Sequence, residues 1–309
     1  MTNILIALVV LLAIVTLVQL TRVSELLGEL KKQDVNEVTD EDNKTQGFLM
    51  LIIGMGFLVF VIWQMIEWNH LLLPEAASVH GQEIDVLMRF SMTLILVVFF
   101  IVTPMLFYFS YRYRGHKQNT AYFLVHNNKL EFIWTIIPTI VLTGVIIFGL
   151  KTWDKAMNVD TSDSQEIEVF VKQFQWLARF PGEDNILGKS NFQLITPTNV
   201  LGIDEEDLNA EDDKIVREVH LVVNEPVVLK FRSQDVIHSA FLPHFRVQMN
   251  CVPGLSTQFA FTPTKTTAQM KKEEGEDFEY VLLCNKICGA SHYNMQMRFV
   301  VETQAEYDL

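Results

Sequence analysis

Four long apolar runs constrain this chain more than any other feature of its sequence. They cover residues 3–20, 47–66, 88–111 and 130–150. A helix needs about 20 apolar residues to cross the hydrocarbon core of a bilayer, so each run predicts one transmembrane helix. The first run could instead be a cleaved secretory signal, but no basic residue precedes it and no clear small-residue cleavage site follows it. We therefore expect it to be a retained helix.

Basic residues in the connections between these runs predict how the chain is oriented. Lysine and arginine near the ends of spans stay on the cytoplasmic side of a membrane. The connection at residues 67–87 has neither and is predicted to be external. The connections after the first and third runs are then cytoplasmic, and both ends of the chain are external. The basic residues in these two connections are Arg22, Lys31, Lys32 and Lys44, and Arg112, Arg114, Lys117 and Lys129.

The composition changes near residue 151, which predicts a second unit that lies in water. The chain of 309 residues has a formal net charge of -13, and residues 151–309 hold 25 acidic residues against 15 basic ones. An acidic surface argues against nucleic acid as a partner and favours a basic protein. We expect three parts: an N-terminal extension with two spans (1–87), a helical hairpin (88–150) and an external domain (151–309).

Short alternating and β-branched runs predict that the external domain consists of strands. Asn224, Glu225 and Pro226 separate two of these runs as a turn would. Strands at such intervals are typical of a β-sandwich or a Greek-key barrel. Residues 181–213, which are acidic and contain Gly and Asn, predict an irregular surface insertion. The predicted strand runs are residues 166–170, 216–223, 227–232, 257–262, 278–283 and 296–301.

Metal-binding side chains are concentrated between the last two predicted strands. Cys284, Cys288, His292 and Met295 lie within twelve positions of one another. Sulfur ligands together with imidazole suit copper, and a loop between strands can hold such ligands in nearly fixed positions. His238, which ends a β-rich run just where a loop begins, is the candidate for one more ligand from a distant part of the domain. The residue types therefore favour a copper site.

Residue types alone leave two alternatives open. Cys284 and Cys288 could form a buried thiol pair or a disulfide, since a spacing of four residues on a loop permits a bridge. Two cysteines and two histidines could instead enclose a tetrahedral zinc ion. The thioether of Met295 and the placement of most ligands on one loop favour copper over zinc. The third cysteine, Cys251, is expected to be a small apolar residue of the core.

The loop at residues 284–295 resembles the binuclear copper motif of subunit II of the haem–copper cytochrome oxidases, Cys-x-Glu-x-Cys-Gly-x-x-His-x-x-Met. The resemblance covers nearly everything after about residue 88. The two spans of residues 1–87 have no counterpart in the family's usual two-helix pattern. Further segments that follow the family's sequence or spacing are His238-Ser239, Pro243 and Val252-Pro253-Gly254, and, in the helical hairpin, residues 111–114 and 126–138.

This resemblance implies a fold and a metal centre. The fold would be a multi-span α-helical membrane region plus an all-β, cupredoxin-like Greek-key barrel. The cofactor would be a pair of copper ions, the CuA centre, which exchanges one electron at a time. The implied ligands are the bridging thiolates of Cys284 and Cys288, the imidazoles of His238 and His292, the thioether of Met295 and the backbone carbonyl of Lys286.

The resemblance also implies a task and partners. The chain would accept electrons from cytochrome c, or from a membrane-bound cytochrome donor in a supercomplex, and pass them to haem in subunit I. Subunit I, with its haems and CuB, and subunit III would complete a cytochrome c oxidase that reduces oxygen to water and translocates protons. We expect the chain in a bacterial plasma membrane, as a multi-pass protein with its copper domain on the periplasmic side. The rival hypotheses are a quinol-oxidase subunit, which lacks the copper centre, and a copper store or assembly scaffold.

Four positions carry further expectations that come from the resemblance. Lys286 stands where the family commonly has a glutamate that helps to bind magnesium, and a cation there puts that magnesium site in doubt. Phe174 replaces the first tryptophan of the family's Gln-Trp-x-Trp segment, which is associated with electron uptake, and Trp176 keeps the second. Phe174 could instead simply fill a pocket of the domain. Glu131 matches a glutamate at the mouth of a proton pathway, although a carboxylate also stabilises a helix start.

Overall fold

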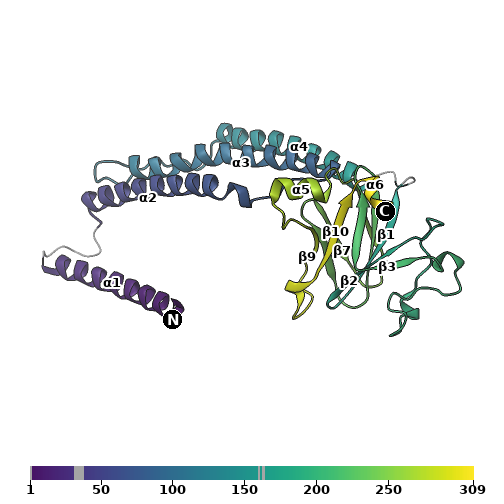
Figure 1. Ribbon diagram of the computed structural model, residues 1–309. Helices are drawn as coiled ribbons and strands as arrows, with labels where there is room; N and C mark the ends of the chain where they lie inside the picture. Colours follow the sequence, from purple (N-terminus) through teal and green to yellow (C-terminus); the bar gives the residue numbers. More distant parts are fainter. Residues whose placement is uncertain (1, 31–37, 159–160, 162–163) are drawn as a thin grey trace. The chain divides into compact units, whose positions relative to one another are not determined.

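Four long helices form the first half of the chain in the computed structural model, which describes residues 2–30, 38–158, 161 and 164–309 (Figure 1). All four are long and apolar enough to cross a membrane, and each predicted span is helical. Each helix extends beyond its predicted apolar run at both ends. The helices are α1 (Thr2–Leu30), α2 (Asp40–Glu67), α3 (Val79–Arg112) and α4 (Asn128–Met157).

The chain divides into two compact units. One comprises Met1–Glu67 and Leu96–His126, and the other comprises Trp68–Ile95 and Asn127–Leu309. The second unit contains the first half of α3, all of α4 and the β-domain. The boundaries at residues 87 and 150 stay a prediction, because a division by compactness does not test a division into an extension, a hairpin and a domain.

In the first unit, α2 packs closely against α3 through two glycines. Gly47 and Gly54 are the buried residues of α2. A Cβ atom added to Gly54 would lie 2.2 Å from Cγ of Phe107, and one added to Gly47 would lie 3.4 Å from Cα of Tyr111. In lipid, helices associate through close packing rather than through burial from water, and small residues permit the approach. The first unit therefore depends on the fit of Phe107 against Gly54.

Two five-stranded sheets form the β-domain, among the residues that the structure describes. One has the order β3-β2-β1-β5-β8 and the other the order β4-β10-β9-β6-β7. The pairs β1–β5 and β4–β10 are parallel, and the remaining neighbours are antiparallel. This arrangement confirms the predicted two-layer β architecture. The strands are β1 (Gln165–Lys172), β2 (Gln175–Phe180), β3 (Lys214–Val216), β4 (Glu218–Val222), β5 (Val227–Ser233), β6 (His238–Leu242), β7 (Val247–Cys251), β8 (Thr257–Phe261), β9 (Tyr280–Cys284) and β10 (Gln296–Glu302).

A core of aliphatic and aromatic side chains lies between the two sheets. The ring of Phe245 lies 5.0 Å from that of Phe261 and 4.5 Å from that of Tyr280, measured between centroids. The hydroxyl of Tyr280 donates a hydrogen bond to the carbonyl of Lys265 at 3.1 Å, so the polar group of this ring is paired. Burial of these rings supplies much of the driving force for closing the two sheets on each other.

The segment between α2 and α3 is bonded to the β-domain within the second unit. The amide of Ala77 donates to the carbonyl of His244 at 2.7 Å, and the hydroxyl of Ser78 donates to the carbonyl of Phe245 at 2.7 Å. The guanidinium of Arg246 donates to both carboxylate oxygens of Asp85, at 2.9 Å each. A bidentate pair of this kind fixes orientation as well as distance. The start of α3 and the β-domain are therefore joined by side chains and by backbone.

The segment 181–213 covers the outer face of the first sheet. It is largely irregular, as predicted, with two short 3-10 turns at Phe192–Leu194 and Leu208–Ala210. Leu201 of this segment forms a small buried cluster with Phe170 of β1 and Leu177 of β2. Those two strand residues are paired in register and point away from the main core. The insertion is thus packed on the sheet rather than looped out into solvent.

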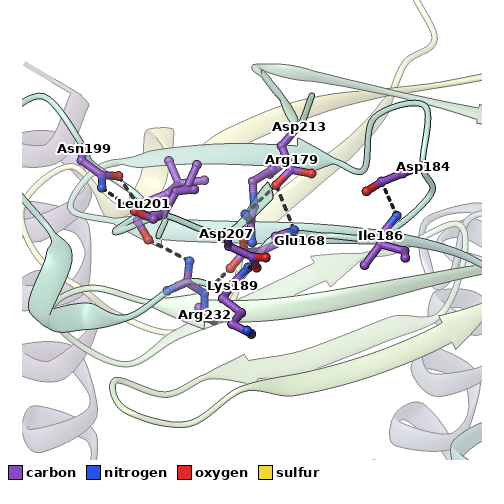
Figure 2. Close-up of polar contacts among 12 residues, drawn as sticks. Glu168, Arg179, Asp184, Ile186, Lys189, Asn199, Leu201, Asp207, Asp213 and Arg232 are labelled. Carbon is purple, nitrogen blue, oxygen red and sulfur yellow. Dashed lines mark hydrogen bonds and ion pairs between the residues drawn. The ribbon is translucent and has the colours of Figure 1, made fainter. Parts of the chain in front are cut away.

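A buried ion-pair network ties the insertion to the sheet (Figure 2). Arg179 Nε lies 2.6 Å from Glu168 Oε2, and Arg179 Nη1 lies 2.8 Å from Asp213 Oδ2. All three side chains are at most 4% exposed. Arg232 pairs with the other oxygen of Glu168 and donates to the carbonyl of Leu201 at 2.9 Å. Burial raises the pKa of Asp213, and the charge of Arg179 opposes that rise.

Replacing Gly54 with leucine should weaken the contact between α2 and α3. Overpacking of this kind typically costs about 1–3 kcal/mol of folding free energy. Gly56 is the matched control, because a Cβ atom there would meet nothing within 4 Å. Thermal unfolding of the detergent-solubilised protein, followed by helical circular dichroism, is the measurement. Gly54→Leu should unfold at a lower temperature than Gly56→Leu, and equal midpoints would contradict the packing described.

Replacing Arg179 with alanine should destabilise the β-domain by about 3–5 kcal/mol, because it leaves buried carboxylates without their cation. The control is Lys230→Ala, whose partner Glu166 is 2.6 Å away but whose side chain and that of Glu166 are each 36% exposed. Removal of such an exposed pair costs about 0–1 kcal/mol. Urea unfolding followed by near-ultraviolet circular dichroism measures both. Similar losses for the two variants would show that the buried network does not stabilise the fold.

Candidate metal centre

Neighbouring strands bring the predicted ligands together at one end of the second sheet. His238 is the first residue of β6 and Cys284 is the last residue of β9, and these two strands pair with each other. The chain then passes through Cys288 and a short 3-10 turn, His292–Asn294, before Met295 leads into β10. Ligands separated by more than 40 positions in the sequence are therefore brought together by strand pairing.

Cys284 occupies one side of the centre. Its sulfur lies 3.9 Å from the sulfur of Cys288. Nδ1 of His238 lies 3.8 Å from the Cys284 sulfur, and the backbone oxygen of Lys286 lies 3.3 Å from it. Within the described part of the chain, His238 and the two cysteines form a group whose ligand atoms all lie within 4.8 Å of one another.

Cys288 occupies the other side. Nδ1 of His292 lies 3.6 Å from its sulfur, and the thioether sulfur of Met295 lies 3.2 Å from it. Cys288 is 4% exposed and Met295 is 2% exposed. Each thiol therefore has one imidazole and one further donor beside it, and the two thiols lie between these two pairs.

The chemistry of this donor set fits a soft metal ion. All three cysteines of the chain are free thiols, and the 3.9 Å between the sulfurs of Cys284 and Cys288 is about twice the length of a disulfide bond. Burial, together with the neighbouring Cys284, raises the pKa of Cys288 to about 11. Two adjacent thiolates are unfavourable here unless a cation compensates their charge. Sulfur and imidazole donors in this arrangement suit copper.

A carboxylate and an amide that the sequence analysis did not single out support the ligands. Asp235 Oδ1 lies 2.9 Å from Nε2 of His238, whose opposite nitrogen faces Cys284. The other oxygen of Asp235 accepts from the amide of Gln173 at 2.6 Å, and the side chain of Gln173 donates to the carbonyl of Cys288. Partial burial opposes the charge on Asp235, but hydrogen bonds, first among them the one from Gln173, hold its pKa below the usual value. Such partners orient an imidazole toward a metal.

The two aromatic residues of interest lie on either side of this support. Phe174 is 39% exposed, and its ring lies against the loop: a Cβ atom added to Gly289 would be 2.8 Å from Cζ of Phe174. Trp176 is only 3% exposed, and its ring centroid is 6.2 Å from that of His238. Phe174 is thus the one of the two that reaches both solvent and the ligand loop.

The remaining sequence candidates lie beside the centre or outside it. The side chain of Lys286 is exposed, while its carbonyl faces Cys284. Cys251 lies opposite His238 in the β6–β7 pairing and is fully buried, and burial raises its pKa to about 12. Such a thiol behaves as a small apolar side chain.

Glu131 lies in the first turn of α4 and belongs to a helix cap. Its carboxylate accepts from the amide of Asn127 at 3.1 Å, and the side chain of Asn127 accepts from the amide of Leu130 at 3.1 Å. Together these bonds satisfy amide groups that a helix start leaves unpaired. A role for Glu131 in proton uptake stays a prediction.

Comparison with known proteins finds two matches to one family. Residues 66–152 match the family described as "Cytochrome C oxidase subunit II, transmembrane domain", and residues 166–303 match "Cytochrome C oxidase subunit II, periplasmic domain". Together these segments cover more than two thirds of the chain. The boundary between them falls where α4 ends and the β-domain begins.

Individual relatives show the same similarity. The chain is 28% identical over 261 residues to the alternative cytochrome c oxidase subunit 2 of Bradyrhizobium diazoefficiens, covering 84% of this chain and 88% of the relative. It is 25% identical over 279 residues to cytochrome c oxidase subunit 2 of Synechocystis sp., covering 84% and 80%. Among solved structures, the periplasmic domain of subunit II of the Bradyrhizobium japonicum cytochrome oxidase is 22% identical, covers 48% of this chain and 90% of its own, and gives a TM-score of 0.32.

The fold and the family matches agree with each other. A helical membrane region precedes a two-sheet β-domain, in the order in which the two family segments occur. The predicted fold class, several apolar membrane helices followed by a β-domain of two sheets, is confirmed. The chain belongs to the cytochrome c oxidase subunit II family.

Proposed function

We propose that the chain binds two copper ions and carries electrons through them to haem in the catalytic subunit of a cytochrome c oxidase. The observation that carries the proposal is the pair of thiols 3.9 Å apart, each with one imidazole and one further donor at its side. A structural zinc ion takes four ligands in a closed tetrahedron. The two sulfurs are common to two groups of donors, and each group adds one imidazole and one further donor. This set of six donors fits two metal ions better than one.

The protein contributes to this chemistry by keeping the metal-binding atoms in fixed positions. Two copper ions held by the thiolates of Cys284 and Cys288 and their neighbouring donors would supply reversible one-electron transfer. His238 is fully buried and is oriented by Asp235, and Cys284 ends a paired strand. Burial of Cys288 and Met295 excludes water from that side of the centre. A site built on paired strands changes little when its charge changes, which favours rapid electron transfer.

The position of Phe174 supports a role in electron uptake. It is part exposed, it contacts the ligand loop at Gly289, and its neighbour Gln173 is bonded to Cys288. A donor that docks at this surface would reach the ligand loop through a single side chain. Trp176 lies deeper and would act mainly by packing against His238. The donor is cytochrome c or a membrane-bound cytochrome domain, and the acidic character of the domain favours a basic one.

The proposal also covers the assembly. The chain would sit in a bacterial plasma membrane with its β-domain on the periplasmic side, beside subunits I and III, in a complex that reduces oxygen and translocates protons. Glu131 would lie at the mouth of a proton path into subunit I. Lys286 offers its carbonyl to copper, whereas its exposed ammonium group cannot ligate magnesium, so no magnesium ligand is assigned to it.

Metal analysis with electron paramagnetic resonance on the purified oxidase tests the proposal. The wild type should hold two copper ions in this chain that share one unpaired electron, since the two thiols are close enough to each other for both to contact the same pair of ions. Cys288→Ser should lose that signal, because it removes a bridging sulfur. Cys251→Ala is the control and should keep it, because Cys251 is a core residue. One zinc ion per chain, or copper that cannot be reversibly reduced, would refute the assignment and favour a store or scaffold.

Replacing Gly289 with alanine should disturb the loop, because the new methyl group would meet Phe174. We expect a changed electron paramagnetic resonance spectrum and slower reduction by the donor. Gly275→Ala is the matched control: both glycines have a positive φ, +143° and +116°, but Gly275 has nothing within 4 Å. Combining Gly289→Ala with Phe174→Ala should restore the spectrum in part, because the methyl group would still lie 2.9 Å from Nε2 of Gln173. An unchanged spectrum in Gly289→Ala would show that the contact with Phe174 does not position the loop.

A further inference from the structure

A small groove lies between the external ends of α3 and α4, both of which belong here to the second compact unit. Its volume is about 310 Å3, and its lining residues are Glu83, Val86, Phe148, Lys151, Thr152 and Lys155. The apolar run of α4 ends just before Lys151, and that of α3 begins just after Val86. The groove is therefore at the level where the hydrocarbon core gives way to lipid headgroups.

The interior of the groove is apolar and is held in place by ring packing. Phe148 of α4 meets Phe90 of α3 edge to face, with 6.2 Å between ring centroids. Cδ2 of Leu87 lies 4.0 Å from the position of a Cβ atom on Gly149, so the two helices approach closely beside the groove. Trp153, which is 61% exposed, lies on α4 two residues after Lys151. Tryptophan is enriched at membrane interfaces, which agrees with this depth.

The mouth of the groove carries an excess of positive charge. Nζ of Lys155 lies 2.9 Å and 3.2 Å from the two carboxylate oxygens of Glu83, so these two charges balance each other. Lys151 is exposed, lies one helical turn before Lys155, and has no ion-pair partner in the described ranges. One cation is thus left over at the rim of an apolar groove, next to a domain that is acidic.

We propose that this groove binds one anionic phospholipid from the outer leaflet. The headgroup phosphate would lie at Lys151 and Lys155, and the first part of an acyl chain would lie on Val86 and Phe148. A soluble anion would gain nothing from the apolar interior, and a zwitterionic lipid would gain less from the uncompensated charge of Lys151. The lipid would fill the space between α3 and α4 on the unit that carries the metal centre.

Native mass spectrometry of the purified full-length chain, delipidated in detergent and then titrated, tests this proposal. The probes are phosphatidylglycerol, phosphatidylcholine with the same acyl chains, and inorganic phosphate. The wild type should retain one phosphatidylglycerol in preference to phosphatidylcholine. Lys151→Gln should bind phosphatidylglycerol about fivefold more weakly, the effect of about 1 kcal/mol per basic residue near a lipid surface. Lys151→Arg should restore binding.

Lys189→Gln, which removes an exposed lysine from the insertion on the outer face of the first sheet, is the matched control and should bind like the wild type. Equal binding of phosphatidylglycerol by the wild type and Lys151→Gln would overturn the proposal. Equal retention of phosphatidylcholine would also overturn it. If inorganic phosphate displaced phosphatidylglycerol at the same concentration as the lipid, the groove would be a site for soluble anions. The proposed lipid site would then be wrong.

Discussion

The antiparallel pairing of β6 with β9 is the constraint on which the metal centre depends. In that register Ala240 lies opposite Cys284, and Ala240 and Leu282 are both fully buried. Residues two apart on a strand face the same side, so the alternation that buries Ala240 and Leu282 also turns His238 and Cys284 inward. If the register of β6 against β9 shifted by one residue, one of these two side chains would point away from the core. The ligand geometry is therefore set by the same packing that forms the core.

Much of this structure follows from local sequence patterns. The features that do not are those that depend on contacts between residues far apart in the chain. The four spans follow from length and apolarity, and the ligand loop follows from spacing. β2, β6 and β7 lie outside the predicted strand runs, and His238 begins β6 rather than ending a run as expected. In β2 the apolar pattern is interrupted by Arg179, which is buried with Glu168 and Asp213 from elsewhere in the chain. The role of Asp235 depends on the fold that turns His238 toward Cys284, although its position three residues before His238 was visible in the sequence.

The β-domain and the contact between α2 and α3 are stabilised by different physics, as water and lipid require. In the β-domain, burial of apolar side chains from water closes two sheets over one core. Lipid offers no such driving force, so α2 is held to α3 by the shape of Gly54 against Phe107. The helices beyond the family's matched segments are therefore not mere additions to the hairpin: at least α2 makes a specific contact with α3.

The bonds that join Ala77, Ser78 and Asp85 to the β-domain bear on how fast the chain can work. The rate at which an electron tunnels between two centres falls steeply as their separation grows. A flexibly attached domain would spend most of its time with the two centres too far apart for electron transfer. Turnover would then be limited by the movement of the domain. Because Arg246 pairs with Asp85 in the first turns of α3, the proposed centre would keep a fixed distance from the start of that helix, and electron transfer would not need to wait for a movement of the whole domain.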